Sequence, residues 1–358
     1  MTGELVQQYQ QHIQDAYVAE TPLCIQGGGS KAFYGRKIKG EILDVSANAG
    51  VISYEPTELV ITVRAGTTIS EINEVLAKEK QMLAFEPPCF ATNATAGGMV
   101  ACGLSGPRRP YVGAVRDFVL GLKCLNGKAE ILNFGGQVMK NVAGYDVSRL
   151  MTGAMGTLGV LLEVSLKVLP EPEYELTLKG ESDLATAIQL MNKWAGQSVP
   201  VSATSFHDGN IYIRLSGHKS AVLAAASQFP LSEYPDGENY WQSLREHKDN
   251  YFADDFFSDS RNLWRLSVPS TTEEINLQGQ WLIEWGGAQR WLITSEPLEQ
   301  IRNVAGKAGG HATLFRGGDR DGEIFQPLST GIEHLHVALK NAFDPKRILN
   351  RGRLYKKF

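Results

Sequence analysis

The chain has 358 residues, a formal net charge of −4 and a pI near 6.0, and 43% of its residues are hydrophobic and 21% charged. This length suits two or three packed regions, and the composition is that of an ordinary soluble globular protein. The weak negative charge gives no support to a nucleic-acid partner. Glycine is abundant, with 37 residues in the whole chain, and 21 of them lie in the first 160 positions, so the backbone is expected to pack closely against something there.

Cysteine spacing argues against a metal-binding protein, and hydropathy argues against a secreted or membrane-spanning one. No pair of cysteines has the Cys-x-x-Cys spacing of a zinc or iron–sulfur site, which favours free thiols in a reducing compartment and no metal in this chain. Residues 1–20 lack the basic start and apolar core of a signal peptide. The longest uncharged segment, 91–107, is too rich in small and polar residues for a membrane span. We expect a cytoplasmic protein that reaches a membrane, at its inner face, only through partners.

The first 85 residues predict a small α/β subdomain. Apolar residues at helical spacing (Leu5, Tyr9 and Ile13) predict an opening amphipathic helix. Thr68 and Glu71 match the capping box of a second helix. Short strands are expected at residues 23–25, 41–45, 51–54, 59–64 and 83–85.

Within this region, residues 26–31 read Gln-Gly-Gly-Gly-Ser-Lys. Glycines let a bulky anion approach the backbone, and successive N–H groups form a nest that suits phosphate or pyrophosphate. Ser30 and Lys31 add a hydroxyl donor and a cation. The spacing is neither that of a Walker A loop nor Gly-x-Gly-x-x-Gly. A flexible turn explains the same glycines, so the loop alone leaves both interpretations open.

A second α/β subdomain is expected from residue 91 onward. Residues 91–106 are almost all small, and a helix beginning near Thr95 would carry Gly97 and Gly98 in its first turn. Its N–H groups could face a phosphate or a flat ring, although close helix packing explains the same pattern. Strands at 117–125 and 128–133 joined at Asn126-Gly127, a helix at 145–151 and an alternating strand at 160–169 complete the region.

After Pro170 and Pro172 the pattern changes, and we place a domain boundary there. Strand, helix, strand, strand and helix are expected over 174–229, and a similar order returns over 263–315, with a short capped helix from Thr271 to Glu274. This is the split βαβ arrangement of an α+β domain. A helix with a loop is expected within 232–260, and a last helix at 330–343. The predicted domains are residues 1–172, 173–325 and 326–358.

Together these motifs resemble the FAD-linked oxidases with the vanillyl-alcohol oxidase and p-cresol methylhydroxylase (PCMH-type) fold. The resemblance covers most of residues 20–170, with Gln26 where the family has Arg and Arg351 where Pro is usual. It is carried in order by residues 26–30 (Gln-Gly-Gly-Gly-Ser), 63–67 (Val-Arg-Ala-Gly-Thr), 92–99 with 113–121, 144–146 (Gly-Tyr-Asp) with 153–160, and 343–352 (Phe-Asp-Pro-Lys-Arg-Ile-Leu-Asn-Arg-Gly).

The resemblance implies a two-subdomain FAD-binding domain, an α+β cap of the split βαβ (ferredoxin-like) type, and a C-terminal helix and tail that return to the flavin domain. The glycine loop would hold the pyrophosphate, residues 92–99 would lie along the flavin and its ribityl chain, and Val160 would contact the adenosine through its backbone. Ser30 stands where members with covalent flavin often have His, so the FAD is expected to be non-covalent. The residues expected to bind it are Gln26, Gly27, Gly28, Gly29, Ser30, Lys31, Pro87, Thr92, Thr95, Gly97, Gly98, Met99, Val160 and Asn350.

Within the family, the short length and the ending from Asn350 to Arg353 most resemble the smaller flavin subunits of bacterial glycolate oxidases. The resemblance implies oxidation of glycolate, a 2-hydroxy acid, to glyoxylate in a complex with a larger flavin subunit and an iron–sulfur subunit, and electron transfer onward. Related dehydrogenases take their base from a His-rich motif, but residues 315–322 contain no His, so no catalytic residue is assigned. Arg316 could bind a carboxylate or form an ordinary ion pair. A self-sufficient FAD-dependent D-2-hydroxy acid dehydrogenase and a degenerate flavin fold that serves only assembly remain open as alternatives.

Overall fold

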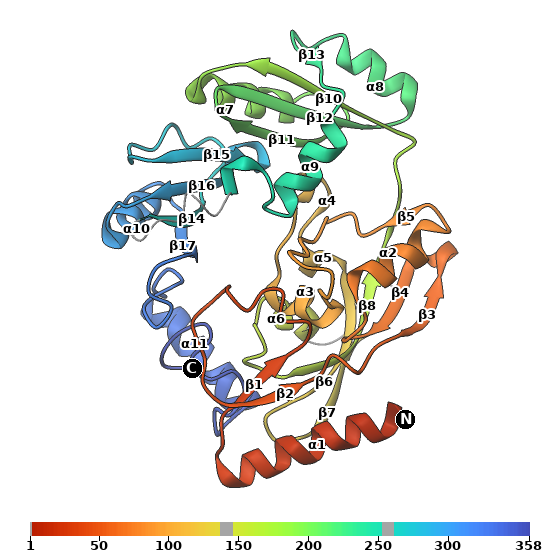
Figure 1. Ribbon diagram of the computed structural model, residues 1–358, viewed down its shortest axis with the longest axis vertical. Coiled ribbons are helices and arrows are strands. Elements are labelled where there is room, and N and C mark those ends of the chain that lie inside the picture. Colours follow the sequence, from red (N-terminus) through yellow and green to blue (C-terminus); the bar gives the residue numbers. More distant parts are fainter. Residues whose placement is uncertain (1, 137–145, 253–260) are drawn as a thin grey trace.

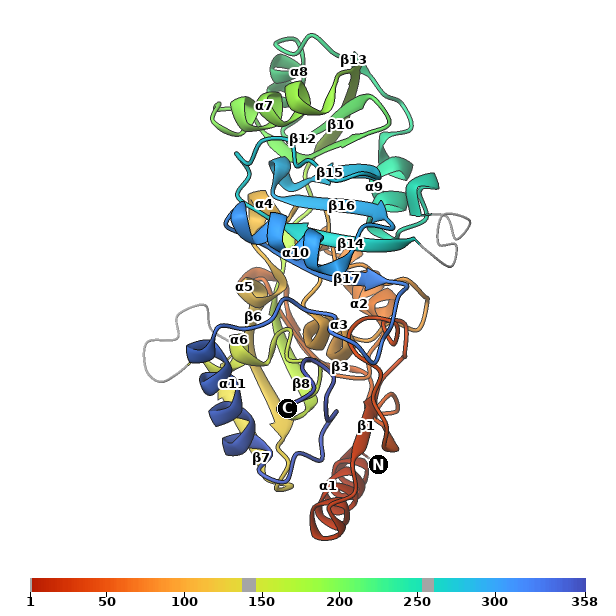
Figure 2. The same ribbon diagram turned by 90° about the vertical axis from the view of Figure 1, so that its left-hand side faces the viewer.

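The computed structural model describes residues 2–136, 146–252 and 261–358 (Figure 1). Two large sheets lie one above the other along the long axis, and Figures 1 and 2 agree on this arrangement. We call the five-stranded sheet with its helices the lower body, and the eight-stranded sheet with its helices the cap. No helix among the described residues is both long and apolar enough to cross a membrane.

The sheet of the lower body is antiparallel, in the order β3-β4-β8-β6-β7. The central strand β8 is buried on both faces, because Val164 and Leu166 pack in one apolar cluster while Val160 and Leu162 pack in another. The strands and the helices that cover the first face are β3 (Val51–Glu55), β4 (Val60–Arg64), β6 (Val119–Leu125), β7 (Ile131–Gly135), β8 (Val160–Lys167), α2 (Ile69–Ala77), α3 (Ala96–Cys102) and α5 (Val115–Phe118).

The second face is covered by α1 (Thr2–Ala19) and by a small parallel sheet of β1 (Leu23–Gln26) and β2 (Glu41–Asp44). The predicted subdomain boundary near residue 85 is therefore wrong, because β3 and β4 join the same sheet as β6 to β8. The predicted strand at 83–85 is also wrong. The chain turns there, and the N–H of Glu86 donates a hydrogen bond to the carbonyl oxygen of Leu83. The strand in this region is β5 (Gln81–Met82), which pairs with β9 (Leu169–Pro170).

Other elements predicted from local sequence signals are present, some of them with shifted boundaries. The capping box of Thr68 and Glu71 is present at the start of α2. The hairpin of β6 and β7 is present, but residues 126–130 all belong to its loop, because the Asn126 side chain accepts hydrogen bonds from the N–H groups of residues 128 and 130. Asp117 lies in α5 rather than in a strand. The predicted helix at 145–151 appears as α6 (Val147–Met151); Gly144 and Tyr145 lie outside the described residues.

The cap follows the predicted order, and the pairing of β11 with β15 joins its two units into one sheet. The sheet order is β13-β10-β12-β11-β15-β16-β14-β17, and all its pairs are antiparallel. The elements are β10 (Tyr174–Glu181), α7 (Leu184–Ala195), β11 (Val201–His207), β12 (Asn210–Gly217), α8 (Lys219–Ala226), β13 (Ser232–Glu233), α9 (Gly237–Arg245), β14 (Asn262–Ser267), β15 (Gln280–Glu284), β16 (Gln289–Thr294), α10 (Leu298–Lys307) and β17 (His311–Arg316).

The predicted helix from Thr271 to Glu274 is wrong, and a distant side chain gives the reason. The Arg290 guanidinium, fully buried, donates to the carbonyl oxygens of Thr272, Glu273 and Gly287. Carbonyl groups held by a guanidinium are not available to a helix, so this segment stays irregular.

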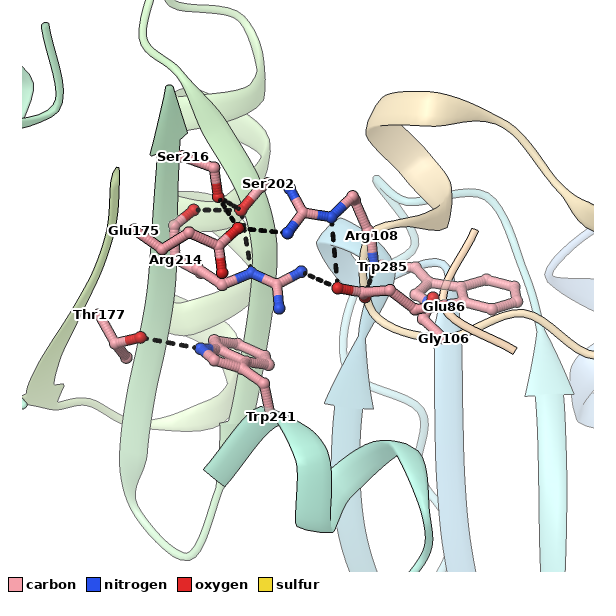
Figure 3. Close-up of polar contacts among 10 residues, drawn as sticks. All are labelled: Glu86, Gly106, Arg108, Glu175, Thr177, Ser202, Arg214, Ser216, Trp241 and Trp285. Atoms are coloured by element: carbon pink, nitrogen blue, oxygen red, sulfur yellow. Dashed lines mark hydrogen bonds and ion pairs between the residues drawn. The ribbon is translucent and has the colours of Figure 1, made fainter. Parts of the chain in front are cut away.

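A buried ionic network joins the cap to the lower body (Figure 3). Arg214 on β12 donates to the Glu86 carboxylate at 2.8 Å, and Arg108 pairs with both Glu86 and Glu175 on β10. The side chains of Arg108, Arg214 and Glu86 are at most 11% exposed. Trp285 adds a hydrogen bond to the carbonyl oxygen of Gly106 at 3.0 Å. These contacts join the cap to the lower body through charged side chains, of which Glu175, at 36%, is the most exposed.

Candidate cofactor site

A cavity of about 430 Å³ lies where the loop after β1, helix α3, the loop before β8 and the C-terminal tail meet. This volume is in the range of ligand and cofactor sites. Ten of the fourteen residues predicted to bind FAD line it: Gln26, Gly27, Gly28, Gly29, Ser30, Lys31, Thr95, Gly97, Gly98 and Asn350.

The glycine loop offers its backbone to the cavity. Among the described residues, no acceptor receives a hydrogen bond from the N–H groups of residues 27–31. Gly29 has a φ of +71°, and a Cβ at Gly28 would overlap the carbonyl oxygen of Asn93. The Asn93 side chain in turn donates to the carbonyl oxygen of Gly28. The loop is thus a tightly held turn with unused donors, as an anion nest requires, rather than a flexible one.

Basic side chains give the cavity a positive character. Lys31 is only 7% exposed, and its Nζ lies 3.3 Å from the carbonyl oxygen of Cys89 and 3.4 Å from Ser30 Oγ. Burial lowers the pKa of Lys31. Lys39 and Arg353 also line the cavity, and no carboxylate among the described residues does. A ligand with phosphate groups fits this charge, since a buried ammonium is stabilised by a nearby anion.

Helix α3 contributes shape rather than free donors. Thr95 caps it, and the N–H groups of residues 96, 97 and 98 donate to the Thr67 and Ala65 carbonyl oxygens and to Thr95 Oγ1. The expectation that its first turn presents free N–H groups is therefore wrong. A Cβ at Gly97 would lie 2.9 Å from that of Ala65, so the glycine permits close packing and leaves a flat wall.

The tail brings Asn350 to the cavity and anchors it there. The Asn350 Oδ1 accepts from the N–H of Ile25 at 2.8 Å, and its Nδ2 donates to the carbonyl oxygen of Met155 at 2.7 Å. Both ends of the amide therefore connect β1 with the loop before β8. A hydrogen bond from Asn350 to a flavin ring stays a prediction.

The anchor of the tail is a buried ion pair at the end of α11 (Thr330–Phe343). Lys340 is 1% and Asp344 is 0% exposed, and their side chains meet at 2.8 Å. The Lys340 ammonium also donates to the carbonyl oxygens of Thr157 and Leu349. The Asp344 carboxylate accepts from the N–H groups of residues 348 and 349. These bonds fix the segment that ends at Asn350.

Four of the predicted residues do not line the cavity. Thr92 is exposed, Met99 is buried in the core beneath it, and Val160 is buried between Gly159 and Leu161, which do line it. Pro87 lines a different cavity of about 790 Å³ between the lower body and the cap.

Several lining residues were missed: Cys24, Cys102, Met155 and Arg353. The charge of Arg353, three positions after Asn350, was the one signal in the sequence. Burial raises the pKa of the Cys24 and Cys102 thiols, so both are neutral. No group of His, Cys, Asp or Glu side chains in the described ranges is arranged to hold a metal ion.

Comparison with known proteins agrees with this geometry. A family model described as an FAD binding domain matches residues 4–135. The chain is 46% identical to glycolate oxidase subunit GlcE of Escherichia coli (strain K12), over 98% of this chain and 96% of that protein. It is 30% identical to a D-lactate dehydrogenase of Anaerostipes hadrus over 39% of this chain and 29% of the relative. It is 33% identical to glycolate oxidase subunit GlcD of Bacillus subtilis (strain 168) over 36% of this chain and 27% of that relative.

Among solved structures, an alkyldihydroxyacetonephosphate synthase superposes with a TM-score of 0.67 over 96% of this chain and 75% of that chain, at 14% identity. This likeness concerns the fold alone. The predicted α+β fold class, with a PCMH-type flavin domain and a cap, is confirmed.

Proposed function

The chain belongs to the FAD-linked oxidase family that contains glycolate oxidase subunit GlcE, and we propose that it is the FAD-carrying subunit of a complex that oxidises glycolate to glyoxylate. It is an FAD-dependent oxidoreductase. The identity of 46% over 98% of the chain carries the proposal, because it spans the cap as well as the flavin domain. A larger flavin subunit and an iron–sulfur subunit are the proposed partners, and contact with a membrane would run through them.

We propose that FAD lies in the cavity of the lower body. The unused N–H groups of residues 27–31 would bind its pyrophosphate, with Lys31 supplying a positive charge. Gly97 and Gly98 would form the flat wall beside the ring and the ribityl chain, with Thr95 holding the helix start. When bound, FAD supplies the two-electron acceptor for a CH–OH donor.

The cofactor is proposed to be non-covalent, because Ser30 occupies the loop position where a histidine would attach it. Acid precipitation followed by absorbance of the pellet and the supernatant tests this. All yellow colour is expected in the supernatant. Colour that stays with the denatured protein would contradict the assignment.

The function is tested by co-purification from the native source with cofactor analysis. We expect FAD on this chain, copurifying subunits with flavin and iron–sulfur absorbance, and reduction of an artificial electron acceptor by glycolate. A Gly28→Ala chain, with Gly331→Ala as control, separates a cofactor role from assembly alone. If Gly28→Ala removes the FAD of this chain and the complex retains full activity, the chain serves assembly only and the proposal fails.

A further inference from the structure

Five rings, which we call the aromatic wall, pack between the lining of the cavity and the strands of the cap: Phe33, Phe90, His247, Trp291 and Phe315. Their ring centroids are 5.5 Å apart between Phe33 and Phe90, 5.0 Å between Phe90 and His247, and 4.8 Å between Trp291 and Phe315. Most of these pairs meet edge to face, the geometry of a packed interior rather than of an open binding site.

The wall packs behind residues that line the cofactor cavity. Lys31, which lines the cavity, holds its ammonium 5.6 Å from the centre of the Phe90 ring. Met155 and Cys102 also line the cavity, and both pack in the apolar cluster that contains the four Phe and Trp rings of the wall. A ligand ring placed between α3 and the tail would therefore have these lining residues, backed by the wall, between it and the cap.

On its far side, the wall reaches the cap strands and leaves little room between the rings and β16 and β17. The small cavity there, lined by four of the wall residues and by Arg265 and Glu284, has a volume of about 20 Å³. A cavity of this size holds about one water molecule. Even the smallest 2-hydroxy acid is several times larger than a water molecule.

The guanidinium of Arg316 packs over two rings of the aromatic wall. Arg316 lies 4.6 Å from the centre of the Phe33 ring and 5.5 Å from that of Phe90. Stacked in this way it stabilises the wall through cation–π contacts. Arg316 thus has a structural role, in which its charge supports the aromatic wall instead of binding a substrate carboxylate.

We propose that the aromatic wall excludes 2-hydroxy acids from the FAD of this chain, so that the chain does not oxidise them alone. Substrate oxidation then requires a second subunit. This inference rests on the proposed function, since it presupposes that FAD occupies the cavity.

The test uses the isolated, FAD-loaded full-length chain under anaerobic conditions. Oxalate resembles glycolate in size and has no C–H bond to oxidise, so it reports binding without turnover. For the unaltered chain we expect no change in the flavin absorbance spectrum with oxalate and no bleaching with glycolate. Dithionite, which needs no substrate pocket, provides the positive control for flavin reduction.

Opening the wall should create the missing access. Phe90→Ala removes a half-buried ring beside Lys31, and Phe33→Ala removes its neighbour. Both variants should show a saturable shift of the flavin spectrum with oxalate. The control is Phe134→Ala, a half-buried ring on β7 that packs against Phe343 rather than the wall, and it should behave as the unaltered chain does.

Two results would overturn the inference. One is a spectral shift with oxalate, or bleaching with glycolate, in the unaltered chain. The other is the absence of any shift in wall variants that retain FAD and unfold at the temperature of the control. A chain that binds no FAD at all would instead contradict the proposed function, and this outcome is read from the cofactor content before any ligand is added.

Discussion

Replacing Asp344 by asparagine should destabilise the protein strongly while leaving side-chain volume unchanged. The substitution removes the counter-charge of Lys340, an ammonium that is only 1% exposed. Breaking a buried pair by neutralising one partner costs about 3–5 kcal/mol, because the remaining charge stays desolvated. Both side chains are almost inaccessible to water, so solvent screening does not reduce this figure.

The free energy of unfolding of this variant should also change more steeply with pH in the alkaline range. Burial lowers the pKa of Lys340, and the Asp344 carboxylate opposes this shift. Without the carboxylate the folded-state pKa falls further below the unfolded value. Between these two values the unfolded chain binds more protons than the folded one, so the free energy of unfolding rises with pH in that window.

The assay is urea unfolding followed by tryptophan fluorescence, together with the affinity for FAD, since the pair fixes the segment that carries Asn350. A double-mutant cycle with Lys340→Met should give a coupling energy of about 1–3 kcal/mol. The control is Lys346→Met, whose partner Glu20 is largely exposed, and its loss should cost about 1 kcal/mol or less. If Asp344→Asn is no more harmful than this control, the reasoning is refuted.

Three further predictions concern the loop, the cap and the junction between the two bodies. Gly28→Ala should weaken FAD binding about tenfold or more, because a Cβ there overlaps a backbone oxygen, whereas Gly331→Ala, in open space, should not change the titrated affinity. Burial raises the pKa of Glu284 from its ordinary 4.5 to about 7. The free energy of unfolding should therefore fall by about 3 kcal/mol as pH rises across that window, and Glu284→Gln should flatten the pH profile of thermal unfolding. Arg214→Met leaves Glu86 with Arg108 as its one remaining ionic partner in the network and should lower the free energy of unfolding by about 1–3 kcal/mol; denaturant unfolding that equals the unaltered chain would contradict this.

Local signals in the sequence predicted most of the helices and strands. The capping box of Thr68 and Glu71 is determined within a few positions, so it is readable without a fold. The expected alternation of β8 is wrong, because both faces of this strand are buried against apolar clusters. The missing helix after Thr271 depends instead on Arg290, which lies on a later strand. The subdomain boundary was misplaced for the same reason, since β4 pairs with β8 about a hundred positions away.

In the candidate site, too, local features were predicted and features that depend on the tertiary structure were not. The glycine loop is a local feature, and its chemistry follows from backbone freedom alone. The donors expected from α3 are consumed by the carbonyl groups of Ala65 and Thr67 in the turn after β4 and by the Thr95 hydroxyl, and only the tertiary structure reveals the first two. Arg353, Cys24 and Cys102 meet at one cavity because the tail returns to β1, and no spacing in the sequence measures that distance.

The return of the tail has a consequence for the timing of biosynthesis. The side chain that positions β1 belongs to Asn350, 325 positions after its partner Ile25. At about 5–20 residues per second, the ribosome delivers it roughly 16–65 s after the loop has been made. During that interval the glycine loop lacks the neighbour that holds it against the loop before β8. Cofactor uptake should therefore follow translation rather than accompany it, and a stalled nascent chain should carry no flavin.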